Sequence, residues 1–174
     1  MLGWMKSSFM FRDANLWKKL YMTYIRPHLE FAAPAWNVYQ KQDIDCIERI
    51  QRRATKVSHN LKQLTYHERL ATLGLTTLEA RRARGDCIQA FKLVTERDIV
   101  NWHSKPRIAE AAYVHRPRMI RQHVNNCAAR HNFFTNRVAN NWNSLTDATV
   151  HSTSVNMFKN SYDQLKIQKT IIII

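Results

Sequence analysis

The scarcity of glycine and proline is the feature that most constrains the fold of this chain. Only 3 glycines and 4 prolines occur among its 174 residues. A fold with many tight turns normally needs more of both, because glycine adopts left-handed turn conformations and proline fixes turn dihedrals. Apolar residues also recur at spacings of three and four, the period of a helix with one buried face. The sequence therefore predicts an all-α fold, a helical bundle followed by a smaller helical region.

The first half of the chain carries the clearest helix signals. One apolar stripe predicts a helix that Pro27 should bend or end near Ile25; the stripe consists of Trp17, Leu20, Tyr21, Tyr24 and His28. A second helix is expected over roughly residues 43–57. Two capping boxes, Thr65 with Glu68 and Thr76 with Glu79, predict two further helices, the first ending at Gly74 and the second running to about Glu96.

The helical pattern weakens between residues 98 and 112, which predicts a linker. It would separate a helical region at 1–97 from a basic helical region at 113–170. In the later region an N-cap is expected at Asn132. Two apolar stripes there predict buried helices: Phe134, Val138, Trp142 and Leu145 in one, and Val155, Phe158, Tyr162 and Leu165 in another that begins near Ser154.

The charge of the chain indicates a polyanionic partner. Lys and Arg number 27 against 13 for Asp and Glu, so the formal net charge is +14. Nucleic acid is the commonest such partner, and an anionic membrane surface is the competing interpretation. No apolar run approaches the roughly 20 residues that a membrane-spanning helix needs. We therefore expect a nucleic-acid partner and no membrane association.

Three groups of cations are candidate nucleic-acid contacts. Arg52, Arg53 and Lys56 lie near the end of their helix, where cations also complement the helix dipole. Arg81, Arg82 and Arg84 lie in the first turns of theirs, where the dipole disfavours cations. A phosphate backbone would explain this placement, as would carboxylates on a packed neighbour, and the family resemblance described below favours the phosphate. The third group is Arg116, Arg118 and Arg121, in a segment that Pro117 makes extended and that a solvated loop would also explain.

The sequence holds no catalytic constellation. Asp43 and Asp45 lie two residues apart on a predicted helix, so they cannot face one metal ion. Cys127, His123 and His131 lack a fourth ligand for zinc. Cys46, Cys87 and Cys127 include no Cys-x-x-Cys pair, which predicts buried thiols in a reducing compartment. We expect a chain without metal or cofactor that acts inside the cell, in the nucleus or cytoplasm, and is not secreted.

Several short blocks resemble the non-LTR (LINE-type, jockey-like) retrotransposon reverse transcriptases, in the part that follows the polymerase core. The blocks are Ile25–Ala33, Ile50–Lys56, Tyr66–Leu70 with Leu73–Leu75, Leu78–Arg82 with Arg84–Asp86, Asn132–Phe134, Arg137–Val138, Trp142–Leu145, Ser154–Asn156 and Phe158–Lys159. They cover most of the chain apart from residues 98–112 and the tail. The resemblance implies a thumb-like bundle and a C-terminal region.

The same resemblance implies what the chain does and lacks. A thumb holds the RNA·DNA template–primer duplex through its backbone, without sequence preference. The Tyr/Phe-x-Asp-Asp turn of the family, whose carboxylates bind Mg²⁺, does not occur here, so we expect no catalysis by this chain alone. Absence of the palm would expose Trp4, Met5, Phe9 and Trp17 and favour self-association. The alternatives are a helical protein-interaction module and a non-functional remnant of a mobile element.

Overall fold

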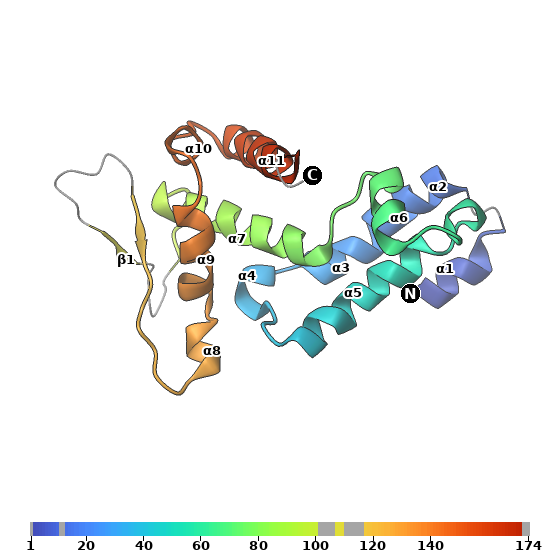
Figure 1. Ribbon diagram of the computed structural model, residues 1–174, viewed down its shortest axis with the longest axis horizontal. Coiled ribbons are helices and arrows are strands. Elements are labelled where there is room, and N and C mark those ends of the chain that lie inside the picture. The colour runs from blue at the N-terminus through green and yellow to red at the C-terminus, as the bar shows by residue number, and fades with distance from the viewer. Residues whose placement is uncertain (1, 11–12, 101–106, 110–116, 172–174) are drawn as a thin grey trace. The chain divides into compact units, whose positions relative to one another are not determined.

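The computed structural model is predominantly helical, which confirms the all-α fold class (Figure 1). It describes residues 2–10, 13–100, 107–109 and 117–171. The chain divides into two compact units, Met1–Arg82 and Ala83–Ile174. The predicted linker at 98–112 therefore falls within the range of the second unit, and most of it lies outside the described residues. Within the described residues, no helix is both long and apolar enough to cross a membrane.

The first unit consists of short helices around one long one. In order they are α1 (Leu2–Ser8), α2 (Ala14–Leu20), the π-helical turn η1 (Tyr21–Ile25), α3 (Arg26–Glu30), α4 (Ala33–Trp36), α5 (Lys41–Thr55), the 3-10 turn η2 (His59–Leu61) and α6 (Tyr66–Leu73). Helix α7 (Leu78–Val94) begins in this unit and continues into the second.

Pro27 changes the helix type ahead of it without ending the helical path. Regular α-helix stops at Leu20, and in the π-turn that follows the Arg26 N–H donates to the Tyr21 carbonyl, five residues back. Proline has no N–H for the usual bond, and its ring clashes with the carbonyl four residues earlier, so a wider turn suits this position. The predicted break near Ile25 thus takes the form of a π-turn, after which α3 resumes the helix.

The core of the first unit lies between α1, α2, η1 and α5. Trp17 is buried, and its indole Nε1 donates to the Ala54 carbonyl at 2.7 Å. Tyr21 and Ile25 extend this face at four-residue intervals, whereas Tyr24 and His28 are exposed, so the predicted stripe was wrong at those two positions. Trp4 is 71% exposed, as expected, but Met5 and Trp17 are buried, because they pack in one cluster with Tyr21, Ile25 and Ala54.

Side-chain caps begin α6 and α7. The capping box of Thr65 and Glu68 is confirmed in both directions, and Gly74 ends α6 in the left-handed conformation with φ of 59°. The backbone hydrogen bond from Thr65 lowers the pKa of Glu68. The second box was wrong by one residue, because the Thr77 hydroxyl, not that of Thr76, accepts from the Ala80 N–H at 3.2 Å. The Thr76 carbonyl accepts a hydrogen bond from the Gln51 side chain of α5.

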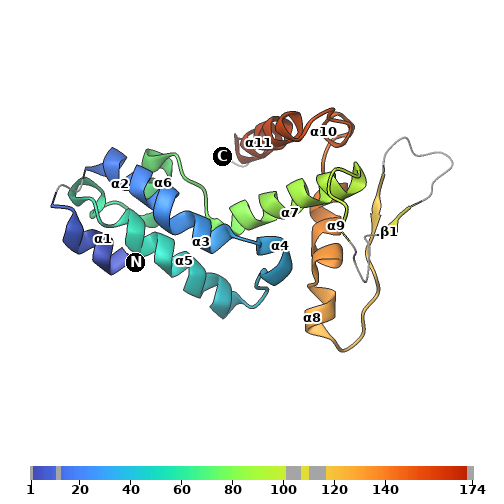
Figure 2. The ribbon, with the colours of Figure 1, turned by 180° about the vertical axis from the view of Figure 1, so that it is seen from behind.

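In its described residues, the second unit contains the rest of α7, a pair of short strands and four further helices (Figure 2). Strands β1 (Arg107–Ile108) and β2 (Met119–Ile120) are antiparallel, with Arg107 opposite Ile120. The helices that follow are α8 (Ala128–His131), α9 (Phe134–Asn143), α10 (Asp147–Val150) and α11 (Val155–Ile171). The extended segment predicted around Pro117 is present as β2, while β1 was not predicted.

The first apolar stripe predicted for this region is buried in its core, and in the second stripe Phe158 and Tyr162 are buried while Val155 and Leu165 are partly buried against them. Phe158 of α11 stacks on Phe91 of α7 with ring centroids 4.5 Å apart, and Trp142 of α9 lies 6.1 Å from Phe158. The Ser154 hydroxyl caps α11 by accepting from the Met157 N–H at 3.1 Å. The N-cap predicted at Asn132 was wrong: α9 begins after Phe133, because the Asn132 side chain instead donates to the Ala128 carbonyl of α8.

The cysteines differ in exposure, which corrects the prediction that all three thiols are buried. Cys46 lies on the outward face of α5 and Cys127 lies at the start of α8, so both are exposed. Cys87 is buried in the core of the second unit. Burial, with a smaller contribution from Asp86, raises the pKa of Cys87 to about 12.

Alkylation should therefore separate the thiols, because the reactive species is the thiolate. We expect iodoacetamide at about pH 8 to label two cysteines of the folded chain and the third only in denaturant. Intact-mass spectrometry counts the labels, and peptide mapping should place the late one on Cys87. Labelling of Cys87 at the rate of the other two would contradict this packing.

Candidate nucleic-acid interface

Helix α5 separates a buried polar face from an outward cationic face. Glu48, Gln51, Ala54 and Thr55 point into the unit and are buried. Arg49, Arg52, Arg53 and Lys56 are all exposed. Because residues three, four and seven apart share one face of a helix, these four cations form one surface. We call these four residues the α5 cationic face.

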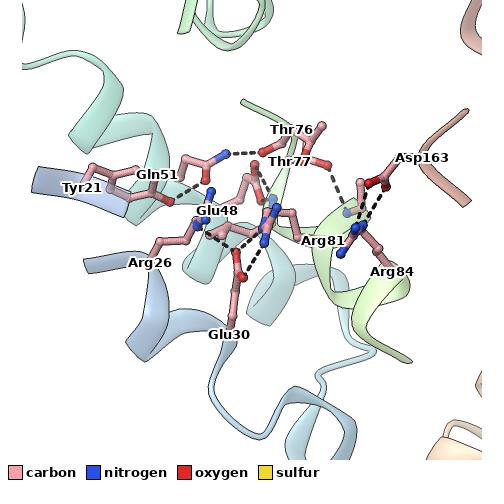
Figure 3. A network of polar contacts seen from close by, with 12 residues as sticks. Tyr21, Arg26, Glu30, Glu48, Gln51, Thr76, Thr77, Arg81, Arg84 and Asp163 are labelled. Atoms are coloured by element: carbon pink, nitrogen blue, oxygen red, sulfur yellow. Dashed lines mark hydrogen bonds and ion pairs between the residues drawn. The ribbon is translucent and has the colours of Figure 1, made fainter. Parts of the chain in front are cut away.

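A buried amide fixes the rotation of α5 (Figure 3). Gln51 is fully buried, and its Oε1 accepts from the Tyr21 hydroxyl at 2.5 Å. Its Nε2 donates to the Thr76 carbonyl and to the Tyr66 hydroxyl, both at 2.9 Å. Buried polar groups of this kind are costly unless they are all satisfied. The bonds of Gln51 therefore hold α5 in the rotation that turns its cations outward.

Glu48 joins the same network at the start of α7. Its buried carboxylate accepts from the Leu78 N–H, at 3.0 Å through Oε2, and from the Tyr66 hydroxyl. Burial and this bond to Glu48 raise the pKa of Tyr66. A carboxylate at a helix N-terminus satisfies a free backbone N–H and complements the helix dipole. A side chain of α5 thus caps α7 from outside that helix.

The α5 cations differ in how they are held. The Arg52 guanidinium carbon lies 5.0 Å from the centroid of the Tyr66 ring, a cation–π distance. No carboxylate in the described part of the chain forms an ion pair with Arg49, Arg53 or Lys56. Arg49 was missed by the sequence analysis, although it lies four residues before Arg53, which was the available signal.

The arginines of α7 have partners within the chain (Figure 3). Arg81 forms a two-pronged ion pair with Glu30 of α3, and Glu30 also pairs with Arg26 at 3.5 Å. Arg84 pairs with Asp163 through two bonds of 2.7 Å. Arg82 is buried, and its Nε donates to the Asn37 side chain at 2.9 Å. Carboxylates and an amide of the chain thus account for cations in the first turns of α7, and contact of these three with phosphate stays a prediction.

The third group of candidates lies around β2. Arg116 is outside the described residues, and Arg118 and Arg121 are exposed. Helix α9 holds this segment by its backbone. The Asn143 side chain accepts from the Met119 N–H and donates to its carbonyl, at 3.0 and 2.9 Å. Asn136 does the same for Gln122, at 2.8 and 3.3 Å. The backbone bonds leave the arginine side chains directed to solvent.

The described residues contain no recognisable catalytic or metal-binding arrangement of side chains. No group of three or more His, Cys, Asp or Glu side chains that could hold a metal ion occurs among them. Asp43 and Asp45 are exposed on α5. No protein-family model, curated protein or solved structure matches this chain.

Proposed function

We propose that this chain corresponds to the thumb and following region of a non-LTR retrotransposon reverse transcriptase and binds RNA·DNA or another nucleic-acid duplex. The α5 cationic face carries the proposal, because its cations face solvent while the helix is fixed from behind by Gln51. The short sequence blocks given above support the choice of an RNA·DNA hybrid as the duplex. The polymerase carboxylates and their Mg²⁺ would belong to the palm, not to this region.

The dimensions of the α5 cationic face suit a phosphate backbone. At a rise of 1.5 Å per residue, Arg49 and Lys56 lie about 10.5 Å apart along the helix axis. One strand of a B-form duplex carries a phosphate about every 3.4 Å of axis, so this length spans about three phosphates. Contacts to phosphates carry no base information. Binding through this face would therefore be independent of sequence.

Removing two of these charges should weaken binding and flatten its salt dependence. For Arg53→Gln with Lys56→Gln, we expect the log–log slope of affinity against salt to fall by about 0.9 for each phosphate that is no longer neutralised, or about 1.8. Fluorescence anisotropy with a labelled RNA·DNA hybrid at several salt concentrations measures the slope. The matched control is Lys19→Gln with Lys41→Gln, which removes two exposed cations from elsewhere in the same unit.

An equal loss of affinity in both double variants would mean that binding follows net charge and not this face. Equal affinity of the unaltered chain for the hybrid, single-stranded RNA and heparin would count against a duplex clamp in the same way. That result would favour the alternative of a protein-interaction module. Contiguous exposed apolar patches mark interaction surfaces, so the exposed side chains of Phe31, at 79%, and Trp4, at 71%, are the positions at which substitution would test this second candidate.

A further inference from the structure

The segment that follows β2 and helix α8 form a cationic cluster. Asn136 binds the backbone of Gln122 and donates at 3.5 Å to the Arg130 carbonyl, so one buried amide ties the two stretches together. Arg121 and Arg130 project from these stretches, and His131 lies beside them. Arg130 donates to the Gln122 side chain at 2.9 Å. The buried amide of Asn136 thus holds the two backbone stretches that carry these cations.

Arg121 donates from a guanidinium nitrogen to Nε2 of His131. A guanidinium has donors only, so Nε2 must accept and carries no proton in this arrangement. Protonation of the imidazole removes the acceptor and places a second positive charge beside Arg121. The hydrogen bond between them then breaks, and both side chains become donors with no mutual bond. A tetrahedral anion can accept from both of them at once.

Within the described residues, the two stretches that carry this pair hold only cationic and neutral side chains. The extended segment carries Arg121 and His123, α8 carries Arg130, and Cys127 is the N-cap residue of α8. From α9 comes Arg137, which is ion-paired with Asp86. Residues 117–146 contain no Asp or Glu. An oxyanion is therefore the natural partner for a doubly donating Arg121 and His131.

We infer that Arg121 and His131 form a proton-linked binding site for a phosphate group of a nucleic-acid backbone. This inference rests on the proposed function for the identity of the ligand and on the second unit alone for its geometry. Acid strengthens binding by adding a charge at His131 and by releasing Arg121. Asn136 acts as a positioning residue, because it holds the two stretches that carry these side chains.

The first test measures the affinity of a labelled RNA·DNA hybrid for the full chain at about pH 7.5 and about pH 5.5, at constant ionic strength. An added unit charge about 4 Å from a phosphate in water strengthens binding about fivefold. His131→Gln should therefore remove about fivefold of the gain on acidification. The quantity compared is the ratio of affinities at the two pH values within each variant, because glutamine offers Arg121 a neutral acceptor at both. His123→Gln is the matched control, since it removes an exposed histidine of the same segment. Equal effects of the two variants would overturn the inference.

The second test detects phosphate binding at His131 directly and does not require the chain to bind a duplex. Dimethyl phosphate, a singly charged backbone mimic, is titrated at about pH 5.5 while histidine ring signals are followed by NMR. Signals of His131, assigned from the His131→Gln spectrum, should shift, and those of His123 should not. Absence of a shift overturns the site. A selective shift in a chain that does not bind the hybrid would leave the site standing and overturn the proposed function instead.

Discussion

Arg137→Ala should destabilise the second unit by about 3–5 kcal/mol, the loss expected when one partner of a buried ion pair is removed. Arg137 donates to both carboxylate oxygens of Asp86, at 2.8 and 2.9 Å. The Asp86 side chain is only 4% exposed, so truncation would leave a charge that water cannot reach. Urea denaturation followed by circular dichroism measures the loss, and hydrogen exchange at α9 amides locates it in this unit.

The chain offers a matched control for this prediction. Arg84 pairs with Asp163 in the same two-pronged geometry, but the Asp163 side chain is 48% exposed. Because water can solvate that carboxylate, Arg84→Ala should cost about 1 kcal/mol or less. Replacing Asp86 and Arg137 together by Leu and Met should recover much of the stability. Equal destabilisation by Arg84→Ala and Arg137→Ala would show that burial of the carboxylate is not what matters.

Glu48→Ala should be the most damaging single polar change in the first unit, at about 3 kcal/mol. The substitution leaves the Leu78 N–H and the Tyr66 hydroxyl without their acceptor, and each unmet buried donor costs about 1–3 kcal/mol. It also removes the negative charge at the start of α7. Thermal and urea denaturation measure the change, with hydrogen exchange at the first amides of α7 as the local readout.

Glu79→Ala serves as the control, because Glu79 is an exposed acidic residue in the first turn of the same helix. Its removal should cost less than about 1 kcal/mol through the helix dipole alone. Glu48→Gln should lie between the two, since the amide keeps one acceptor but brings N–H donors that need partners. A destabilisation by Glu79→Ala as large as that by Glu48→Ala would refute the view that buried bonds dominate at this helix start.

Local signals predicted the helices well where the determinants lie within one turn. The Thr65–Glu68 box, the end of α6 at Gly74 and the cap at Ser154 all depend on hydrogen bonds between residues at most five positions apart. The second box failed because tertiary contacts decided it. Gln51 takes the Thr76 carbonyl and Glu48 takes the Leu78 N–H, so Thr77 is left to cap α7. Those contacts span 25 and 30 residues of sequence, which no local pattern reveals.

The candidate site was predictable to a similar extent. The cations of α5 follow from helical spacing, and their exposure agrees with the amphipathic pattern. The partners of Arg81 and Arg84 lie 51 and 79 residues away along the chain, so their ion pairs could not be foreseen. Favouring phosphate over carboxylate at α7 therefore rested on the placement of the cations along the helix and on the resemblance to the reverse transcriptases. The hydrogen bond of Arg121 with His131 could not be foreseen either, because it bridges an extended segment and a short helix.

Two asparagines of α9 also cover backbone groups of the extended segment that a second chain could otherwise bind. Seven residues of helix and three residues of extended chain both cover about 10 Å, so Asn136 and Asn143 match the backbone groups of Gln122 and Met119. One edge of β2 is paired with β1, and on the other edge Asn143 binds the backbone N–H and carbonyl of Met119. An exposed strand edge is a template on which another chain can add a strand. Helix α9 thus takes, at Met119, the hydrogen bonds that a neighbouring strand would make, and Asn136 does the same at Gln122 just beyond the strand.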